Sequence, residues 1–164
     1  MDDFSLPDTN VEPSAASRIS GKYISAIYRH LQILINARLE PFRIGSGQFF
    51  FLLMIAAKEG ISQKALSEEL LIDKATTAKA IRKLEEEGYV YRENDPEDNR
   101  YHLIFLTEFG KTSLPKIQKV INDVNKKSRA GIPDEQFELM MELLQKMLFN
   151  VSEEVHKLRD GENK

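Results

Sequence analysis

Four basic side chains stand close together in the middle of this 164-residue chain, and none of the residues 74–83 is acidic. These cations are Lys74, Lys79, Arg82 and Lys83, and the acidic run of Glu85, Glu86 and Glu87 comes only after them. Cations grouped in this way can pair with phosphate oxygens or with the base edges of DNA. Thr76 and Thr77 are short enough to let a helix approach DNA closely, and they offer a hydroxyl or a methyl contact. The same pattern is also typical of a solvated helix face crossed by salt bridges, so both interpretations stay open.

A further candidate contact lies in the acidic turn that follows. Arg100 is the only Lys or Arg between Arg92 and Lys111. An arginine inserted into a narrow minor groove is a known means of reading DNA shape. Asp98, two residues earlier, can hold the guanidinium in position by a charge-assisted hydrogen bond. The alternative is a surface salt bridge worth about 0 to 1 kcal/mol.

The elements that must position these residues form a recognisable order. Ser62 can cap a short helix, and Asp73 can cap a second helix over 74–87 that Gly88 ends. Two helices joined by so few residues predict a helix-turn-helix. The turn 94–99 lies between two alternating segments, which predict a β-hairpin directly after the second helix. This order is that of a winged helix-turn-helix, in a chain that is otherwise mainly α.

Long amphipathic helices flank this lobe. Apolar residues recur at helical spacing from Ser14 to Leu39, and again from about Pro133 to Leu158. Thr107 can cap a helix between them, and a helix opened by Gly45–Gly47 should run to Gly60. The two outer stripes either pack on the core of their own domain or pair with a second copy, and we favour a homodimer. The predicted organisation is a flexible arm over 1–13, a helical dimerisation region over 14–44 and 111–164, and a winged helix-turn-helix over 45–110.

Composition argues against several classes of protein. The chain has no cysteine, so thiolate metal sites and thiol redox sensing are excluded. His30, His102 and His156 are scattered, so we expect no metal site. There is no phosphate-binding glycine loop, nucleophile motif or pair of carboxylates on an apolar face, so we expect neither an enzyme nor a cofactor.

The net charge of −3 argues mildly against a nucleic-acid partner. Salt screens long-range fields within about 8 Å, however, so the local grouping of charge matters more than the sum. No apolar run approaches the ~20 residues of a membrane span. The acidic first residues lack the layout of a signal peptide, and we therefore expect a cytoplasmic protein.

At these residues the chain resembles the MarR (multiple antibiotic resistance regulator) family of transcription factors. The family's wing motif is an Asp-x-Arg, then apolar residues, then Leu-Thr-x-x-Gly. Here it is matched by Asp98-Asn99-Arg100, Leu103-Ile104-Phe105 and Leu106-Thr107-Glu108-Phe109-Gly110. The segment KATTAKAIRKLEEEGYV is similar to the family's recognition helix and its exit. The resemblance extends from about residue 20 to residue 155.

The resemblance implies a homodimeric, sequence-specific transcriptional regulator that binds an inverted repeat in double-stranded DNA, and we expect a repressor. By this likeness Arg100 reads the minor groove and Asp98 supports it. The residues facing the major groove would be Lys74, Thr76, Thr77 and Lys79, and those nearer the backbone Arg82, Lys83, Ser62 and Gln63. The chain departs from the family at Asn99, where many members have a further arginine, and at Leu71, where the turn often has glycine.

The resemblance also implies a small aromatic or phenolic effector that relieves DNA binding. Ligand sites favour junctions such as that between the helical body and the DNA-reading lobe. The candidate lining residues are Tyr28, Arg29, His30, Arg43 and Phe50. The alternative is that the phenylalanines 49–51 are core residues and that Arg29 or Arg43 pairs with a carboxylate. A winged helix used for protein contacts is the second functional hypothesis, and it would show no salt-dependent DNA binding.

Overall fold

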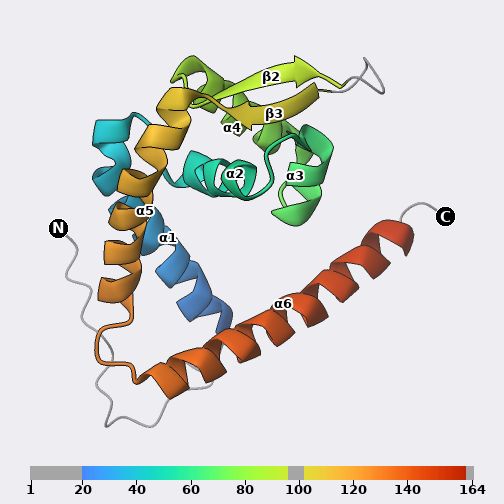
Figure 1. Ribbon diagram of the computed structural model, residues 1–164. Helices are drawn as coiled ribbons and strands as arrows, with labels where there is room; N and C mark the ends of the chain where they lie inside the picture. Colours follow the sequence, from blue (N-terminus) through green and yellow to red (C-terminus); the bar gives the residue numbers. More distant parts are fainter. Residues whose placement is uncertain (1–19, 96–101, 162–164) are drawn as a thin grey trace, which may run out of the picture. The chain divides into compact units, whose positions relative to one another are not determined.

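The computed structural model describes residues 20–95 and 102–161 (Figure 1). Its elements in chain order are α1 (Ser20–Leu39), the 3-10 helix η2 (Glu40–Phe42), α2 (Ser46–Ala57), β1 (Ile61–Ser62), α3 (Gln63–Glu69), α4 (Lys74–Glu86), β2 (Val90–Asn94), β3 (His102–Leu106), α5 (Glu108–Ser128) and α6 (Asp134–Gly161). The chain divides into two compact units, Met1–Ile121 and Asn122–Lys164.

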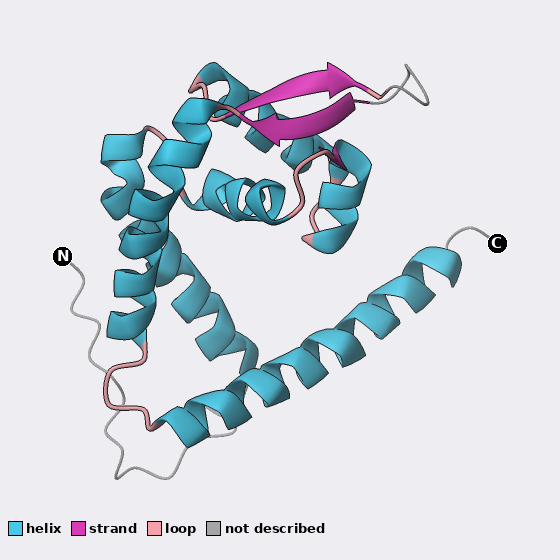
Figure 2. Cartoon of the chain, in the orientation of Figure 1, coloured by secondary structure: helices cyan, strands magenta, loops and turns pink. Residues whose placement is uncertain are grey.

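Helices dominate, and the three strands form one small sheet (Figure 2). The sheet is antiparallel in the order β1-β3-β2. In the hairpin, Val90 pairs with Leu106 and Asn94 with His102. The mainly α fold with a winged helix-turn-helix is therefore confirmed. The strand β1 was not predicted, because two residues are too short to show any alternation.

The three predicted helix caps are confirmed. The Ser62 hydroxyl accepts a hydrogen bond from the backbone N–H of Ala65 at 3.2 Å. The Asp73 carboxylate accepts one from the N–H of Thr76 at 2.9 Å, which holds the pKa of Asp73 below its ordinary value. Each bond satisfies a donor that the first turn of the helix leaves without a partner. The two caps fix where α3 and α4 begin.

The start of α5 is locked against the end of α4. Thr107 caps the helix by accepting the N–H of Gly110 at 2.9 Å, and its hydroxyl donates to the Gly88 carbonyl at 2.6 Å. A Cβ at position 110 would lie 2.2 Å from the Tyr89 carbonyl oxygen, closer than real Cβ atoms come. This close approach explains why the Leu-Thr-x-x-Gly motif needs its glycine.

The helix α2 is shorter than predicted. It ends at Ala57 rather than at Gly60. Lys58 leaves the helical conformation, while its N–H still bonds the Met54 and Ile55 carbonyls. Gly60 instead takes a left-handed φ of +81° and donates its N–H to the Ile104 carbonyl at 2.9 Å. The glycine thus turns the chain into the sheet, because a left-handed backbone is costly for other residues.

The core of the first unit lies among α2, α3, α4 and the hairpin. It is built of aliphatic and aromatic side chains that the helical and strand periods turn to one side. The largest members are Phe49, Phe51, Leu52, Ile55, Leu66, Ile81, Leu84, Tyr89 and Ile104. The Tyr89 hydroxyl donates to the Phe42 carbonyl at 2.8 Å, which ties the end of α4 to the corner between α1 and α2. This core holds the recognition elements in place.

Candidate nucleic-acid interface

The helix α4 presents a basic face opposite its buried one. Ala80, Ile81 and Leu84 are buried, and the exposed positions opposite them include Lys79 and Arg82. Lys74 is exposed in the first turn. Within the described part of the chain, these three cations form no ion pair. No acid among residues 20–95 and 102–161 therefore competes with an outside anion for these cations.

Two of the three glutamates after the basic segment form ion pairs with basic side chains. Glu85 pairs with Arg92 of β2 at 3.3 Å. Glu87 pairs with Lys83 at 2.6 Å and with Arg43 at 2.9 Å, and the hydrogen bond from Lys83 is the main cause that lowers its pKa. Of the four cations of α4, only Lys83 has an acidic partner among the described residues. The interpretation of a salt-bridged face therefore applies to Lys83 and not to the other three.

A cavity of about 490 Å³ opens between the start of α3, the start of α4 and the hairpin. None of its lining residues is acidic. They are Ser62, Gln63, Lys64, Lys74, Arg92, His102 and Ile104. The structure thus brings together three predicted contact residues and adds three basic ones, Lys64, Arg92 and His102. Two of these, Arg92 and His102, could have been predicted from the hairpin register. Arg92 pairs with Ile104 and Asn94 pairs with His102, so the two basic residues lie close together in the sheet.

One predicted contact is wrong. The side chain of Thr77 is fully buried, and its hydroxyl donates to the Asp73 carbonyl at 2.9 Å. Because Thr77 lies one turn after the cap residue, on the same side as the buried Ala80 and Ile81, its short side chain points into the core. Thr76 remains exposed, and Thr77 is removed from the candidate groove contacts.

Two other predicted residues, Asp98 and Arg100, lie outside the described residues. The wing contact proposed for them therefore stays a prediction.

The effector candidates are spread over two helices and a corner. Tyr28 is exposed on α1, where Arg29 donates to the Ser25 hydroxyl and His30 bonds the Ala26 carbonyl. Phe50 is exposed, whereas its two phenylalanine neighbours are buried core residues. Arg43 pairs with Glu87, as the alternative interpretation of this arginine expected.

The described residues offer neither a metal site nor a membrane span. Over residues 20–95 and 102–161, no three His, Asp or Glu side chains come together as ligands for a metal ion. Within the same residues, every helix is too short or too polar to cross a bilayer.

Comparison with known proteins identifies the family. The sequence model of the MarR family matches residues 44–102, which span α2 to the start of β3. The transcriptional regulator HosA of Escherichia coli O111:H- is 35% identical over 101 residues, covering 62% of this chain and 75% of HosA. The chain belongs to the MarR family.

Solved MarR structures have the same fold. A MarR transcriptional regulator from Methanosarcina mazei Go1 is 42% identical, with a TM-score of 0.74 over 81% of this chain and 96% of that one. A MarR-family regulator from Listeria monocytogenes, solved with 26mer DNA, is 26% identical, with a TM-score of 0.75 over 81% of this chain and 89% of that one. The present chain is a DNA-binding MarR-family transcriptional regulator.

Proposed function

We propose that the protein binds an inverted-repeat operator as a homodimer, acts there as a repressor, and is released by a small-molecule effector. The observation that carries the DNA contact is the row of exposed cations on α4 that have no acidic partner among the described residues. Unpaired cations on the helix that follows the turn can displace counterions from phosphates, which is the main source of affinity for DNA. A relative from Listeria monocytogenes was solved with 26mer DNA, which supports the same partner here.

The proposed contacts divide into groove and backbone. Lys74, Thr76 and Lys79 lie in the first half of α4 and are assigned to the major groove. The backbone contacts are assigned to Arg82, Lys83, Ser62 and Gln63, together with the cavity residues Lys64, Arg92 and His102. Arg100, supported by Asp98, is assigned to the minor groove on the sequence motif alone.

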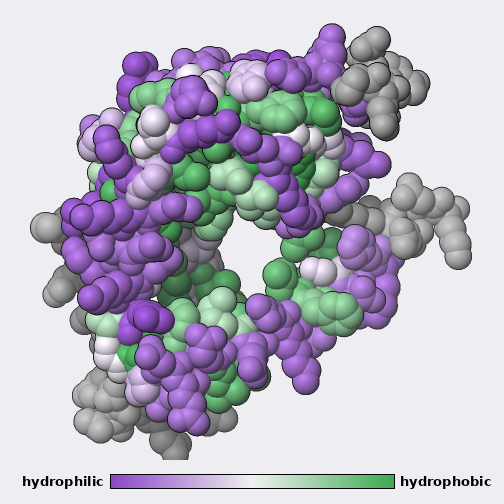
Figure 3. All heavy atoms as spheres, in the orientation of Figure 1, coloured by the Kyte–Doolittle hydropathy of each residue, from purple (hydrophilic) through white to green (hydrophobic). Residues whose placement is uncertain are grey.

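Exposed apolar side chains support the homodimer. On α6 they form a nearly continuous series, visible as green patches between purple polar side chains (Figure 3). The series is Leu139, Met140, Met141, Leu143, Leu144, Met147, Leu148, Phe149, Val151, Val155 and Leu158. An apolar surface of this length on a single chain marks an interface. A second copy presents the same surface and can cover it by two-fold symmetry, with the regions 14–44 and 111–164 as the dimerisation body.

The effector proposal concerns small aromatic or phenolic acids. Tyr28 and Phe50 offer exposed rings, and Arg29, His30 and Arg43 are the candidate polar residues for a carboxylate or phenol. An effector acts by favouring a dimer conformation that binds DNA less well.

The test is selection of duplex DNA from a random pool, followed by fluorescence anisotropy at several salt concentrations. We expect an enriched inverted repeat whose half-sites lie about one helical turn apart. Changing Arg100 to Ala should cost about 1 to 3 kcal/mol of operator binding. Enrichment of no sequence, with no dependence of binding on salt, would favour a winged helix used for protein contacts. Selected sites without two-fold symmetry would contradict the homodimer.

A further inference from the structure

One carboxylate joins the recognition helix to the corner between α1 and α2. Glu87, at the C-terminal end of α4, accepts from the Lys83 ammonium at 2.6 Å through Oε1 and from Arg43 Nε at 2.9 Å through Oε2. Only 7% of the Glu87 side chain is exposed, whereas 78% of the Arg43 side chain is. The two cations therefore hold a nearly buried negative charge from opposite oxygens.

Lys83 has two possible anionic partners under the proposed function. Its side chain is 41% exposed, and it lies one turn after Lys79 on the DNA-reading helix. An ammonium that bonds Glu87 at 2.6 Å has its charge partly offset by the carboxylate, so it attracts a DNA phosphate less strongly. The remaining α4 cations have no such competitor among the described residues. Lys83 is thus the cation of α4 whose contribution depends on a protein acid.

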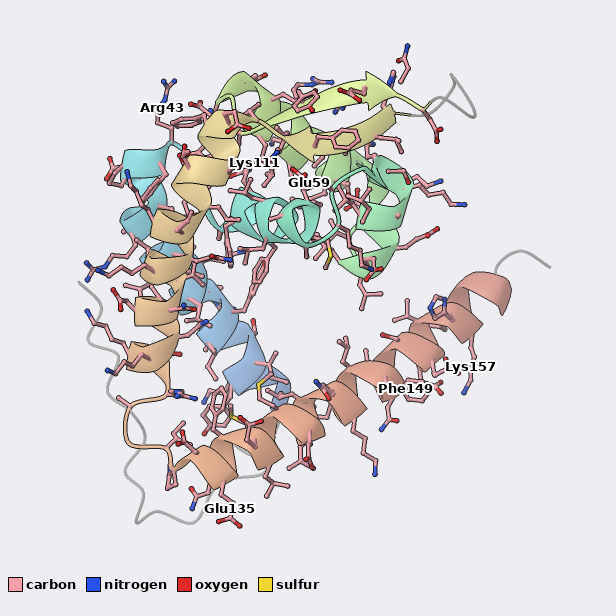
Figure 4. The ribbon with its side chains drawn as sticks, viewed as in Figure 1. Arg43, Glu59, Lys111, Glu135, Phe149 and Lys157 are labelled. Atoms are coloured by element: carbon pink, nitrogen blue, oxygen red, sulfur yellow. The ribbon has the colours of Figure 1, made fainter. Side chains whose placement is uncertain are left out.

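Arg43, labelled in Figure 4, lies at the corner between α1 and α2. Its side chain pairs there with the Glu87 carboxylate. Arg43 has a left-handed φ of 56°, and its N–H donates to the Glu40 carbonyl at 2.9 Å. The bond from the Tyr89 hydroxyl to the Phe42 carbonyl holds the neighbouring residue against the same lobe. Arg43 therefore stays paired with Glu87 when Lys83 moves away. A nearly buried carboxylate would otherwise be left without a partner, which is costly.

We infer that Glu87 competes with DNA phosphates for Lys83, and that Arg43 weakens this competition by neutralising Glu87. This inference rests on the proposed function, since it requires Lys83 to reach the DNA backbone. Glu87 and Arg43 are positioning residues that act through Lys83. They set how strongly the operator is bound without touching it.

Substitutions of Glu87 and of Arg43 should change operator affinity in opposite directions. Glu87→Gln keeps the shape of the side chain and frees Lys83, so the partial phosphate contact of Lys83 becomes a full one. The slope of log K against log salt should steepen by a part of the ~0.9 that one full phosphate contact contributes, and the operator should bind about threefold tighter at 0.1 M salt. Arg43→Asn removes the cation with a residue that tolerates a left-handed backbone. Glu87 then holds Lys83 more strongly, so binding should weaken about threefold to tenfold and the slope should flatten.

Glu86→Gln is the matched control, because Glu86 is exposed and has no ion pair among the described residues. It removes the same charge from the same helix end, and it should leave the salt slope unchanged. In a Lys83→Ala background, Glu87→Gln should have no effect on the slope, because the cation it frees is absent. Circular dichroism of each variant verifies that the fold is kept.

Three results would overturn the inference while leaving the proposed function intact. They are a Glu87→Gln slope equal to that of Glu86→Gln, a Lys83→Ala slope equal to that of the unaltered protein, and tighter binding by Arg43→Asn. Failure of the proposed function itself appears differently, as an unaltered protein whose binding to the selected duplex does not depend on salt.

Discussion

The glycine at position 110 offers the sharpest test of how the lobe is held together. Gly110→Ala would place a methyl carbon 2.2 Å from the Tyr89 carbonyl oxygen, and Cβ atoms stay at least 3.0 Å away. The start of α5 must therefore withdraw by 0.8 Å or more, the difference between these two distances. The two nearest atoms are the carbonyl oxygen and carbon of Tyr89. This carbonyl accepts the N–H of Thr107, so it cannot rotate away.

The cost follows from what the shift breaks. Overpacking a tight contact costs about 1 to 3 kcal/mol. The shift also strains the Gly110 N–H bond to the Thr107 hydroxyl, 2.9 Å long, and loss of such a cap costs about 0.5 to 2 kcal/mol. We expect a loss of about 1.5 to 5 kcal/mol in the free energy of unfolding, which is a large share of the ~5 to 15 kcal/mol of a typical domain.

Urea unfolding followed by far-ultraviolet circular dichroism measures this loss. Protein concentration must be the same for all variants, because association contributes to apparent stability. The control is Gly47→Ala in the first turn of α2, where an added Cβ meets nothing within 4 Å. It should stabilise the protein by up to about 1 kcal/mol, since alanine loses less conformational entropy than glycine.

The two substitutions are chemically identical, so opposite signs isolate the contact with Tyr89. A Gly110→Ala protein within about 1 kcal/mol of the unaltered one would refute the close approach, given the spread of ordinary helix substitutions. A destabilised Gly47→Ala protein would instead refute the assumption that position 47 faces open space.

Three further predictions concern the turn, the cap and the groove face. Leu71 is 66% exposed and has a left-handed φ of 54°. Leu71→Gly should stabilise the protein by about 0.5 to 1 kcal/mol in urea unfolding, because a strain of ~1 to 2 kcal/mol exceeds the entropic cost of glycine. The pKa of Asp73 in the folded protein lies below the ordinary 3.8, so its contribution is complete at neutral pH and is lost as the pH falls through the folded pKa. Asp73→Asn keeps a good cap but does not titrate. The difference in the free energy of unfolding between this variant and the unaltered protein should therefore shrink from about pH 6 to about pH 3. A difference that stays constant over this range would contradict the prediction. Lys79→Ala should cost about 1 to 3 kcal/mol of operator binding, as the loss of a groove contact does, and leave stability within about 0.5 kcal/mol. An unchanged affinity would remove Lys79 from the interface.

Local features of the fold could be predicted because they depend on residues close in sequence. Ser62, Asp73 and Thr107 each bond an N–H three residues later, so their types and spacing are sufficient to place three helix starts. The hairpin could be predicted from alternation on both sides of a turn. The end of α2 was predicted three residues too late, at Gly60 instead of Ala57. The pattern indicates where a helix can end, but it does not show that the Gly60 N–H will bond a strand, here at Ile104.

The contact set could be predicted only in part. The basic character of α4 is visible in the sequence, and so is the absence of acids within it. The inward turn of Thr77 was missed, because the side of α4 that becomes buried depends on how the helix packs on its neighbours. Lys64, Arg92 and His102 were missed as well, since they meet in one cavity only after the hairpin folds back toward α3.

By itself, the sequence determined the order of the helix-turn-helix and the hairpin, three helix caps, the family motif and the supply of cations on the recognition helix. Only the tertiary structure decided which of those cations pairs with an acid among the described residues. Lys83 is held by Glu87, and Glu87 is shared with Arg43, a residue 44 positions away in the chain by the difference of their numbers. Pairing of this kind depends on the approach of two elements through the core. A run of charges read along one helix cannot reveal it.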